Sequence, residues 1–231
     1  MLSAKLGPGA CVCVAIALAL AGSCDSAVPP GTDGTPVTTT IPELRAGTVA
    51  LGTLVTIEDC VVTSDPSQNA RAFFVQDPEA TQHGGLMVYN SNLGLEPMAP
   101  GTLVTLLGTY QEYQGSAQLV ISTLSDVVGN GSADVVPAPV AVKAELVADA
   151  EACEPYESML VRLEPATVTA VDAVAGTWTL DDLVIVDDFL YAASPFPAVG
   201  TAFAWIQGIL YQSAGGFRLE PRSASDICPS P

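Results

Sequence analysis

The sequence predicts an all-β fold of two tandem five-stranded barrels, and three observations lead to this prediction. Of the 231 residues, 49% are hydrophobic, 20 are Gly and 18 are Pro. The chain therefore has enough apolar residues for a core and enough turn-forming residues to divide it into short elements. Short β-branched and aromatic runs recur along its body, without a persuasive amphipathic helical period. The second part of the body also repeats the residue types of the first.

The amino terminus has the pattern of a secretory signal. Lys5 is followed by an uncharged apolar stretch from Ala10 to Ala21, and then by small residues. This stretch is too short to cross a hydrocarbon core of about 30 Å as a helix. We therefore expect no permanent transmembrane anchor.

The residues that end this stretch, 20–24, resemble the lipobox of bacterial lipoproteins, in which the Cys is acylated and becomes the first mature residue. Ala21 stands where that pattern usually has Leu. The resemblance implies a signal peptide over residues 1–23 and lipidation of Cys24. Two alternatives are an ordinary signal peptide cut near Ala27 and a cytoplasmic protein with a buried first helix.

Residues 24–40 are rich in Pro, Gly and Thr and lack apolar periodicity, so we expect a flexible tether. The protein is then exported and anchored in the bacterial cell envelope, at the outer membrane or the periplasmic face. Its first expected partner is the membrane, through the lipid.

The body of the chain contains an internal repeat. The matching segments are 55–63 with 161–169, 73–77 with 178–182, 100–108 with 199–208, and 115–127 with 215–227. Order, spacing and residue type agree over these segments, which indicates duplication. The second copy is shorter in its middle, where the segment around His83 has no counterpart.

Two domains of similar size follow from this repeat. We expect domain 1 over residues 41–128, a linker at 129–143, domain 2 over residues 144–228, and a tail at 229–231. Gly and Pro residues mark the linker as a turn and a short connector.

Each copy contains five predicted strands, bounded by Gly, Pro, Asn or Asp. In the first copy they fall within residues 52–63, 71–77, 85–90, 101–114 and 117–124. A long β-branched first strand and a Gly-bounded fourth favour a small closed barrel, because closure removes the exposed edges of apolar strands. One or two helical turns are expected in residues 142–152.

These runs resemble the OB-fold domain of exported bacterial proteins, the type appended to some extracellular nucleases and found in envelope lipoproteins. The resemblance covers residues 41–228 and implies two OB-like Greek-key barrels. An OB barrel hosts many functions, so the resemblance specifies the fold and no activity. The matching region includes no nuclease domain.

Three Cys residues remain after the signal and the lipidation site are set aside: Cys60, Cys153 and Cys228. Cys153 precedes the first strand of the second copy and Cys228 follows the last. A disulfide between them would bracket domain 2, and we expect it in an oxidising compartment. Cys60 is expected to be a small buried residue.

The charge of the chain argues against two classes of partner. The 25 Asp and Glu residues against 7 Lys and Arg give a formal net charge of −18, which opposes nucleic-acid and anionic-membrane binding. The single His, His83, lies in a polar loop, and no known nucleophile, metalloprotease, phosphate-loop or dinucleotide motif is present. We therefore expect no catalysis and no cofactor.

The densest group of acidic residues consists of Asp181, Asp182, Asp187 and Asp188. Carboxylate oxygens suit Ca²⁺, so these four are candidate metal ligands. Their spacing matches no EF-hand loop, and the alternative is that the two pairs are the polar ends of a buried strand.

Aromatic residues on predicted strands provide candidate stacking surfaces for a ligand. At least half of them must belong to the core. Arg218 and Arg222 are the nearest approach to a basic groove, but Glu220 lies between them. The candidate ligand-binding residues are Phe73, Tyr89, Tyr110, Trp178, Trp205, Tyr211, Arg218 and Arg222.

The sequence thus predicts a lipid-anchored envelope protein with a non-catalytic binding or spacer role. Its ligand is unidentified, and an envelope or extracellular protein is a possible partner. The alternatives are an accessory nucleic-acid-binding module for an extracellular nuclease, a Ca²⁺-binding envelope module, and a hydrolase that uses carboxylates in the barrel loops.

Overall fold

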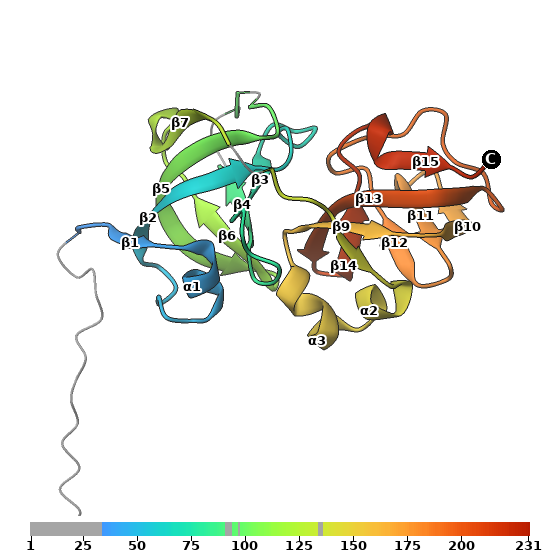
Figure 1. The fold of residues 1–231 in the computed structure, drawn as a ribbon, viewed down its shortest axis with the longest axis horizontal. Helices are drawn as coiled ribbons and strands as arrows, with labels where there is room; N and C mark the ends of the chain where they lie inside the picture. Colours follow the sequence, from blue (N-terminus) through green and yellow to red (C-terminus); the bar gives the residue numbers. More distant parts are fainter. Residues whose placement is uncertain (1–33, 91–93, 97, 134–135) are drawn as a thin grey trace, which may run out of the picture.

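Two β-sheets, each with its own short helices, make up the described part of the protein (Figure 1). A computed structural model describes residues 34–90, 94–96, 98–133 and 136–231. The expected signal peptide, Cys24 and the first part of the tether lie outside the described residues. The all-β prediction is confirmed, since short strands dominate both parts of the chain.

The first sheet has seven strands in the order β1-β2-β3-β4-β6-β5-β7. Strand β2 also pairs with β5, so the pairing that leaves β2 through β3, β4, β6 and β5 returns to β2. Strands β4 and β6 are parallel. The bounds are β1 (Val37–Thr39), β2 (Leu54–Val62), β3 (Ala72–Gln76), β4 (Gly85–Tyr89), β5 (Thr102–Tyr113), β6 (Ser116–Val120) and β7 (Val127–Ser132).

The second sheet repeats this order with eight strands. Strands β9 and β10 together take the place of β2, because Pro165 lies between them and has no N–H for the ladder. Strands β12 and β14 form the equivalent parallel pair. The bounds are β8 (Val140–Val142), β9 (Leu160–Leu163), β10 (Ala166–Asp172), β11 (Thr177–Leu180), β12 (Val184–Val186), β13 (Ala202–Ser213), β14 (Gly216–Glu220) and β15 (Ile227–Pro229).

Short helices precede the long first strand of each sheet. Helix α1 begins after Thr40, whose side chain accepts a hydrogen bond from the Glu43 N–H while the Glu43 carboxylate accepts one from the Thr40 N–H. Ile41 and Leu44 of this helix are buried. The helices are α1 (Ile41–Arg45), α2 (Ala144–Ala148) and α3 (Ala150–Cys153), with 3₁₀ turns η1 (Leu124–Asp126), η2 (Glu154–Tyr156) and η3 (Ala224–Asp226).

The strand register reproduces the sequence repeat residue by residue. Val55 is paired with Gly108 in the first sheet, and the matching Val161 is paired with Gly208 in the second. A Cβ atom at either glycine would lie within 3.0 Å of the adjacent strand, so both positions require the same close backbone approach.

The sheets extend beyond the expected domain limits. Strand β1 lies inside the expected tether and is parallel to β2, and β7 continues past residue 128 in its pairing with β5. Strand β8 lies inside the expected linker and pairs with β9. We call residues 37–132 the first half and residues 140–229 the second half.

Each half encloses its own hydrophobic core, and a third apolar cluster joins the halves. The joining cluster places buried Phe74 and Met87 of the first half with Leu160 and Ile209 of the second. Gly85 also faces the second half, where a Cβ atom would collide with the backbone of Ser158. The outer faces of the two sheets are therefore packed directly against each other.

Polar contacts surround this apolar cluster. The buried Glu157 carboxylate of the second half accepts a hydrogen bond from the Ala117 N–H at 2.9 Å and forms an ion pair with Arg45. On the other side of the cluster, the Arg222 guanidinium donates to the Thr63 carbonyl at 3.0 Å. Hydrogen bonds and an ion pair thus hold the two halves together.

Candidate functional site

A cavity of about 480 Å³ lies where the two halves meet. Its volume is within the range of small-molecule sites. We call it the inter-sheet cavity, and its lining consists of Asn69, Arg71, Ala72, Met87, Tyr89, Gln111, Tyr113, Gln118, Val120, Phe189 and Tyr211.

The strand register of the first sheet builds the floor of this cavity. Met87, Gln118 and Gln111 lie side by side on β4, β6 and β5, because each is the register partner of the next. Tyr89 and Val120 form the adjacent row. Residues paired in this way project to the same side of a sheet, so the two rows make one continuous surface.

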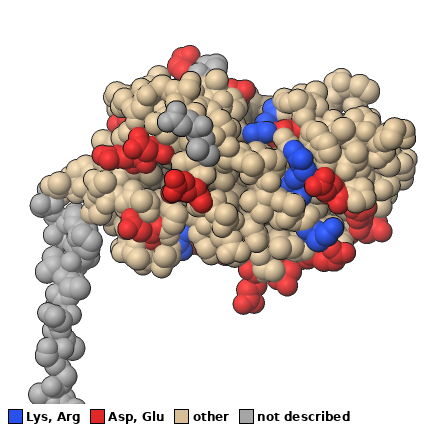
Figure 2. All heavy atoms as spheres, viewed as in Figure 1, with Lys and Arg blue, Asp and Glu red and all other residues tan. Residues whose placement is uncertain are grey.

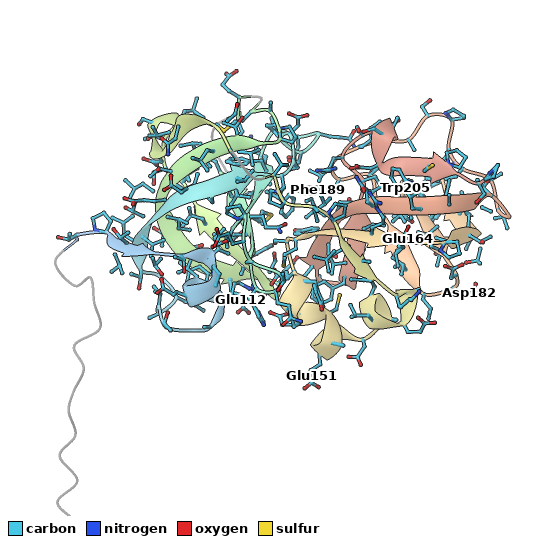
Figure 3. The ribbon with its side chains drawn as sticks, viewed as in Figure 1. Glu112, Glu151, Glu164, Asp182, Phe189 and Trp205 are labelled. Carbon is cyan, nitrogen blue, oxygen red and sulfur yellow. The ribbon has the colours of Figure 1, made fainter. Side chains whose placement is uncertain are left out.

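The second half supplies an aromatic wall. Phe189, which follows β12, stacks on Tyr211 of β13 with ring centroids 5.2 Å apart and an angle of 12° between the planes. Phe74 of the first half contacts Tyr211 edge-on at 5.8 Å. In Figure 3, Phe189 lies at the boundary between the halves. These ring contacts hold the wall in place against the first sheet.

Amide side chains provide most of the polar groups of the lining. Gln118 is 6% exposed and makes no side-chain hydrogen bond to any described residue. Asn69 accepts hydrogen bonds at its Oδ1 atom from Ser67 and from the Arg71 N–H, which leaves its NH₂ group as a donor. Burial raises the pKa of Tyr211, so its hydroxyl remains protonated at neutral pH and is a further donor.

The lining differs in charge from the rest of the protein. The chain has 25 acidic residues, yet the eleven described residues that line the inter-sheet cavity include no Asp or Glu. They also include no Ser, Cys or His, and Arg71 is the single charged member. Figure 2 shows acidic side chains dispersed over both halves, and on the face shown they do not form one continuous patch. The lining of the cavity thus carries one positive charge and no negative charge, in an otherwise acidic protein.

The structure brings together two of the eight candidate ligand residues, Tyr89 and Tyr211. Phe73, Tyr110 and Trp178 are buried in the cores of their own sheets and do not line the inter-sheet cavity. Phe73 and its neighbour Phe74 project to opposite sides of β3, and only Phe74 reaches the boundary between the halves.

The remaining candidates lie on the second half, away from the cavity lining. The Arg162 guanidinium covers the ring of Trp205 at 4.5 Å. Arg218 forms an ion pair with Asp187, and Arg222 forms one with Asp226 at 2.7 Å. The positive charges of Arg218 and Arg222 are therefore matched by carboxylates instead of forming a basic groove.

The candidate calcium ligands are not brought together. Asp181 and Asp182 form the turn between β11 and β12, whereas Asp187 and Asp188 follow β12. Asp182 and Phe189, the residue after Asp188, lie far apart in Figure 3. No cluster of three potential metal ligands occurs in the described ranges. The metal prediction is corrected: the two pairs are the ends of one buried strand.

The expected disulfide between Cys153 and Cys228 is also absent. Both are free thiols in the structure, as is Cys60. Cys153 faces the core of the second half from α3, whereas Cys228 lies on β15 in register with Trp205. Burial raises the pKa of Cys60 and of Cys153 to about 12, so both thiols stay protonated and unreactive.

The sequence reasoning missed the amides Gln111 and Gln118 and the aromatic residue Phe189. Gln118 carries a recognisable signal, since it is a polar residue between the apolar Ala117 and Leu119 of β6. Phe189 carries none, because it lies outside a strand and reaches the cavity only through the packing of the two halves.

Two buried carboxyl groups lie near the cavity without lining it. Burial raises the pKa of Glu157, against the opposing effect of the nearby Arg45. Burial raises the pKa of Glu220 well above its ordinary value of 4.5, and repulsion from Asp187 adds to the increase. The Glu220 carboxylate accepts a hydrogen bond from the Phe189 N–H at 3.2 Å, which positions the aromatic wall.

Comparison with known proteins finds no matching family model and no matching curated protein. In the part of the chain that the structure describes, no helix has the length and hydrophobicity needed to span a membrane. The fold and the inter-sheet cavity therefore define the protein only as an all-β protein with a ligand-sized site between two similar sheets.

Proposed function

We propose that this protein is a lipid-anchored binding protein of the bacterial cell envelope, which holds a small ligand between two OB-like barrels without catalysing a reaction. The single observation that carries the binding role is the inter-sheet cavity, which is lined by aromatic rings and by the amides of Asn69, Gln111 and Gln118. A spacer role would not require such a cavity.

The strand pairing supports the two OB-like barrels. In each half five strand positions pair in a cycle, and the third and fifth positions are parallel. This is the arrangement that a five-stranded Greek-key barrel of the OB type requires. A three-residue strand, β1 or β8, extends the first position of each cycle.

The chemistry of the lining supports binding in preference to catalysis. General acid–base and nucleophilic catalysis need titratable or nucleophilic side chains within hydrogen-bond reach of the substrate. The lining offers amides, aromatic rings and one guanidinium. These groups orient a ligand and do not exchange protons with it near neutral pH.

Ligand binding at this site is tested by nitrogen-15 NMR of the side-chain amides of Gln111 and Gln118, titrated with saccharides, oligothymidylate, fatty acids and short peptides. We expect one class of compound to shift both resonances. If every class left them unshifted while the protein remained folded, the binding function would be refuted.

The lipid anchor is supported by the lipobox-like residues that end in Cys24. We expect Cys24→Ala to release the protein from the membrane fraction of bacteria that express the full chain. Cys60→Ala is the matched control, because the Cys60 thiol is buried in the first core. Unchanged partitioning of the Cys24 variant would show that the lipid is not the anchor.

A further inference from the structure

We infer that the inter-sheet cavity binds a neutral carbohydrate, and this inference rests on the binding function proposed above. The aromatic rings, the amide groups and the charge of the lining each support it. Together they argue against a metal ion, a nucleic acid and a fatty acyl chain as the ligand.

The aromatic part of the lining fits the apolar face of a sugar ring. Tyr89 and Tyr113 of the first half and Tyr211 of the second contribute rings to one cavity. An aromatic face carries partial negative charge and attracts the polarised C–H groups that project from one side of a pyranose. Tyr113 is 61% exposed, so its ring is available at the rim of the cavity.

The amide part of the lining fits hydroxyl groups. A hydroxyl both donates and accepts hydrogen bonds, and the side chains of Gln111, Gln118 and Asn69 offer both functions as well. Gln118 is the decisive residue, because it is nearly buried and no described residue satisfies its amide. A hydroxyl of a ligand in the cavity can donate a hydrogen bond to the Gln118 amide oxygen or accept one from its NH₂ group.

The charge and the amide groups of the lining argue against metal ions, nucleic acids and fatty acyl chains as ligands. A hard metal ion would need carboxylates, and the described lining contains none. A nucleic acid would need several cations, whereas Arg71 is the single cation of the lining and the chain has a net charge of −18. A fatty acyl chain would cover three amides without bonding to them, which costs free energy.

Isothermal titration calorimetry of the full chain with maltotriose, cellotriose and chitotriose tests the inference. We expect at least one of these neutral oligosaccharides to bind, with an affinity that changes little between about 50 and about 500 mM NaCl. Oligothymidylate and a fatty acid are the comparison probes.

Two variants place the binding in the cavity. We expect Tyr113→Ala and Gln118→Leu each to weaken saccharide binding about tenfold, because each removes roughly 1.4 kcal/mol of contact. Trp205→Ala and Gln82→Leu are the matched controls, since both residues lie outside the lining, and we expect them to change affinity by less than about twofold. Circular dichroism checks that each variant is folded.

The outcomes separate this inference from the function on which it rests. If the neutral oligosaccharides failed to bind while another probe bound and lost affinity in Gln118→Leu, the ligand would not be a carbohydrate, but the binding function would stand. If a saccharide bound and both variants left its affinity unchanged, the binding site would lie outside the inter-sheet cavity. If no probe bound, both the inference and the proposed function would be refuted.

Discussion

The two halves have the same strand order and register, yet they present different chemistry on the same outer face. Four positions correspond: Gln111 with Tyr211, Gln118 with Arg218, Tyr89 with Asp187, and Val120 with Glu220. In the first half these side chains are uncharged and form the floor of the inter-sheet cavity. In the second half three of them are ionisable as Arg, Asp or Glu, and Arg218 and Asp187 neutralise each other.

This difference shows that the backbone of each sheet does not determine which half carries the ligand site. The side chains at a few outward positions determine it, because Arg218 and Asp187 form an ion pair on the second half, whereas the corresponding Gln118 and Tyr89 line the cavity. The two halves therefore share a strand order and register without sharing the site.

The largest expected effect concerns the ion pair that joins the halves. Arg45 and Glu157 have side chains 6% and 0% exposed, so Arg45→Met leaves a buried carboxylate without its cation. We expect the free energy of unfolding to fall by about 3 kcal/mol, measured by urea denaturation. The corresponding ion pair of the second face is more exposed, and Arg218→Met should cost only about 1 kcal/mol. Equal losses would contradict this ranking.

The next largest loss of stability is expected from substitutions at Gly108 and Gly208, the equivalent glycines at which the backbone lies close to the adjacent strand. In Gly208→Ala the new Cβ atom would lie 2.4 Å from the Glu220 carbonyl oxygen, whereas in Gly108→Ala the nearest atoms, the Leu119 Cγ and the Val120 carbonyl oxygen, are each 2.8 Å away. We expect thermal denaturation to show losses of about 3 kcal/mol and about 2 kcal/mol.

Gly129 is the control for this pair, because a Cβ atom there meets open space. Gly129→Ala should change stability by less than about 1 kcal/mol. A greater loss in Gly108→Ala than in Gly208→Ala would contradict this ranking, which follows from the shorter distance at Gly208.

A smaller effect is expected from the pH dependence of the second half. Glu220 binds its proton more tightly in the folded than in the unfolded state, since its pKa is raised, so the free energy of unfolding falls as the pH rises above 4.5. Glu220→Gln removes this dependence and should gain roughly 1 kcal/mol over wild type at pH 8, with little gain at pH 4.

The first half has Val120 at this position, so its face contributes no such titration. Glu164→Gln, at an exposed residue, is the matched control and should leave the pH profile of stability unchanged. If Glu220→Gln kept the wild-type slope between pH 4 and pH 8, another group would be the source of the pH dependence.

The smallest effect on stability is expected from moving the second-half ion pair into the first half. The double variant Tyr89→Asp with Gln118→Arg should change the free energy of unfolding by less than about 1 kcal/mol, because both positions face the cavity and not a core. It should nevertheless abolish ligand binding, as measured by calorimetry. Retained binding would show that these positions do not distinguish the two faces.

Most of the fold could be predicted from residue patterns. Long alternating runs such as β2 and β5 are recognisable because one side of each faces a core. Strands β1 and β8 were missed, since three residues are too few to show a period and only pairing with β2 or β9 makes them strands. The interruption between β9 and β10 depends on Pro165, within a run that otherwise resembles β2.

The site was less predictable because it arises from the contact between the halves. Aromatic residues on strands gave Tyr89 and Tyr211, but the same criterion also selected Phe73, Tyr110 and Trp178, which face the cores. To tell the two groups apart, the inner and outer sides of each strand must be assigned. The expected disulfide was wrong because sequence order placed Cys153 and Cys228 at the ends of one domain, whereas their side chains have different surroundings.

The cavity has a floor from one half and a wall from the other, and this shared construction links ligand occupancy to the docking of the halves. A ligand that contacts both Gln118 and Tyr211 favours the docked state by RT ln(1 + [L]/Kd). If the chain were cut in the segment between β7 and β8, the two fragments would then assemble more tightly as ligand concentration rises. The same arrangement would turn the protein into a reporter, in which reassociation of the fragments measures the ligand.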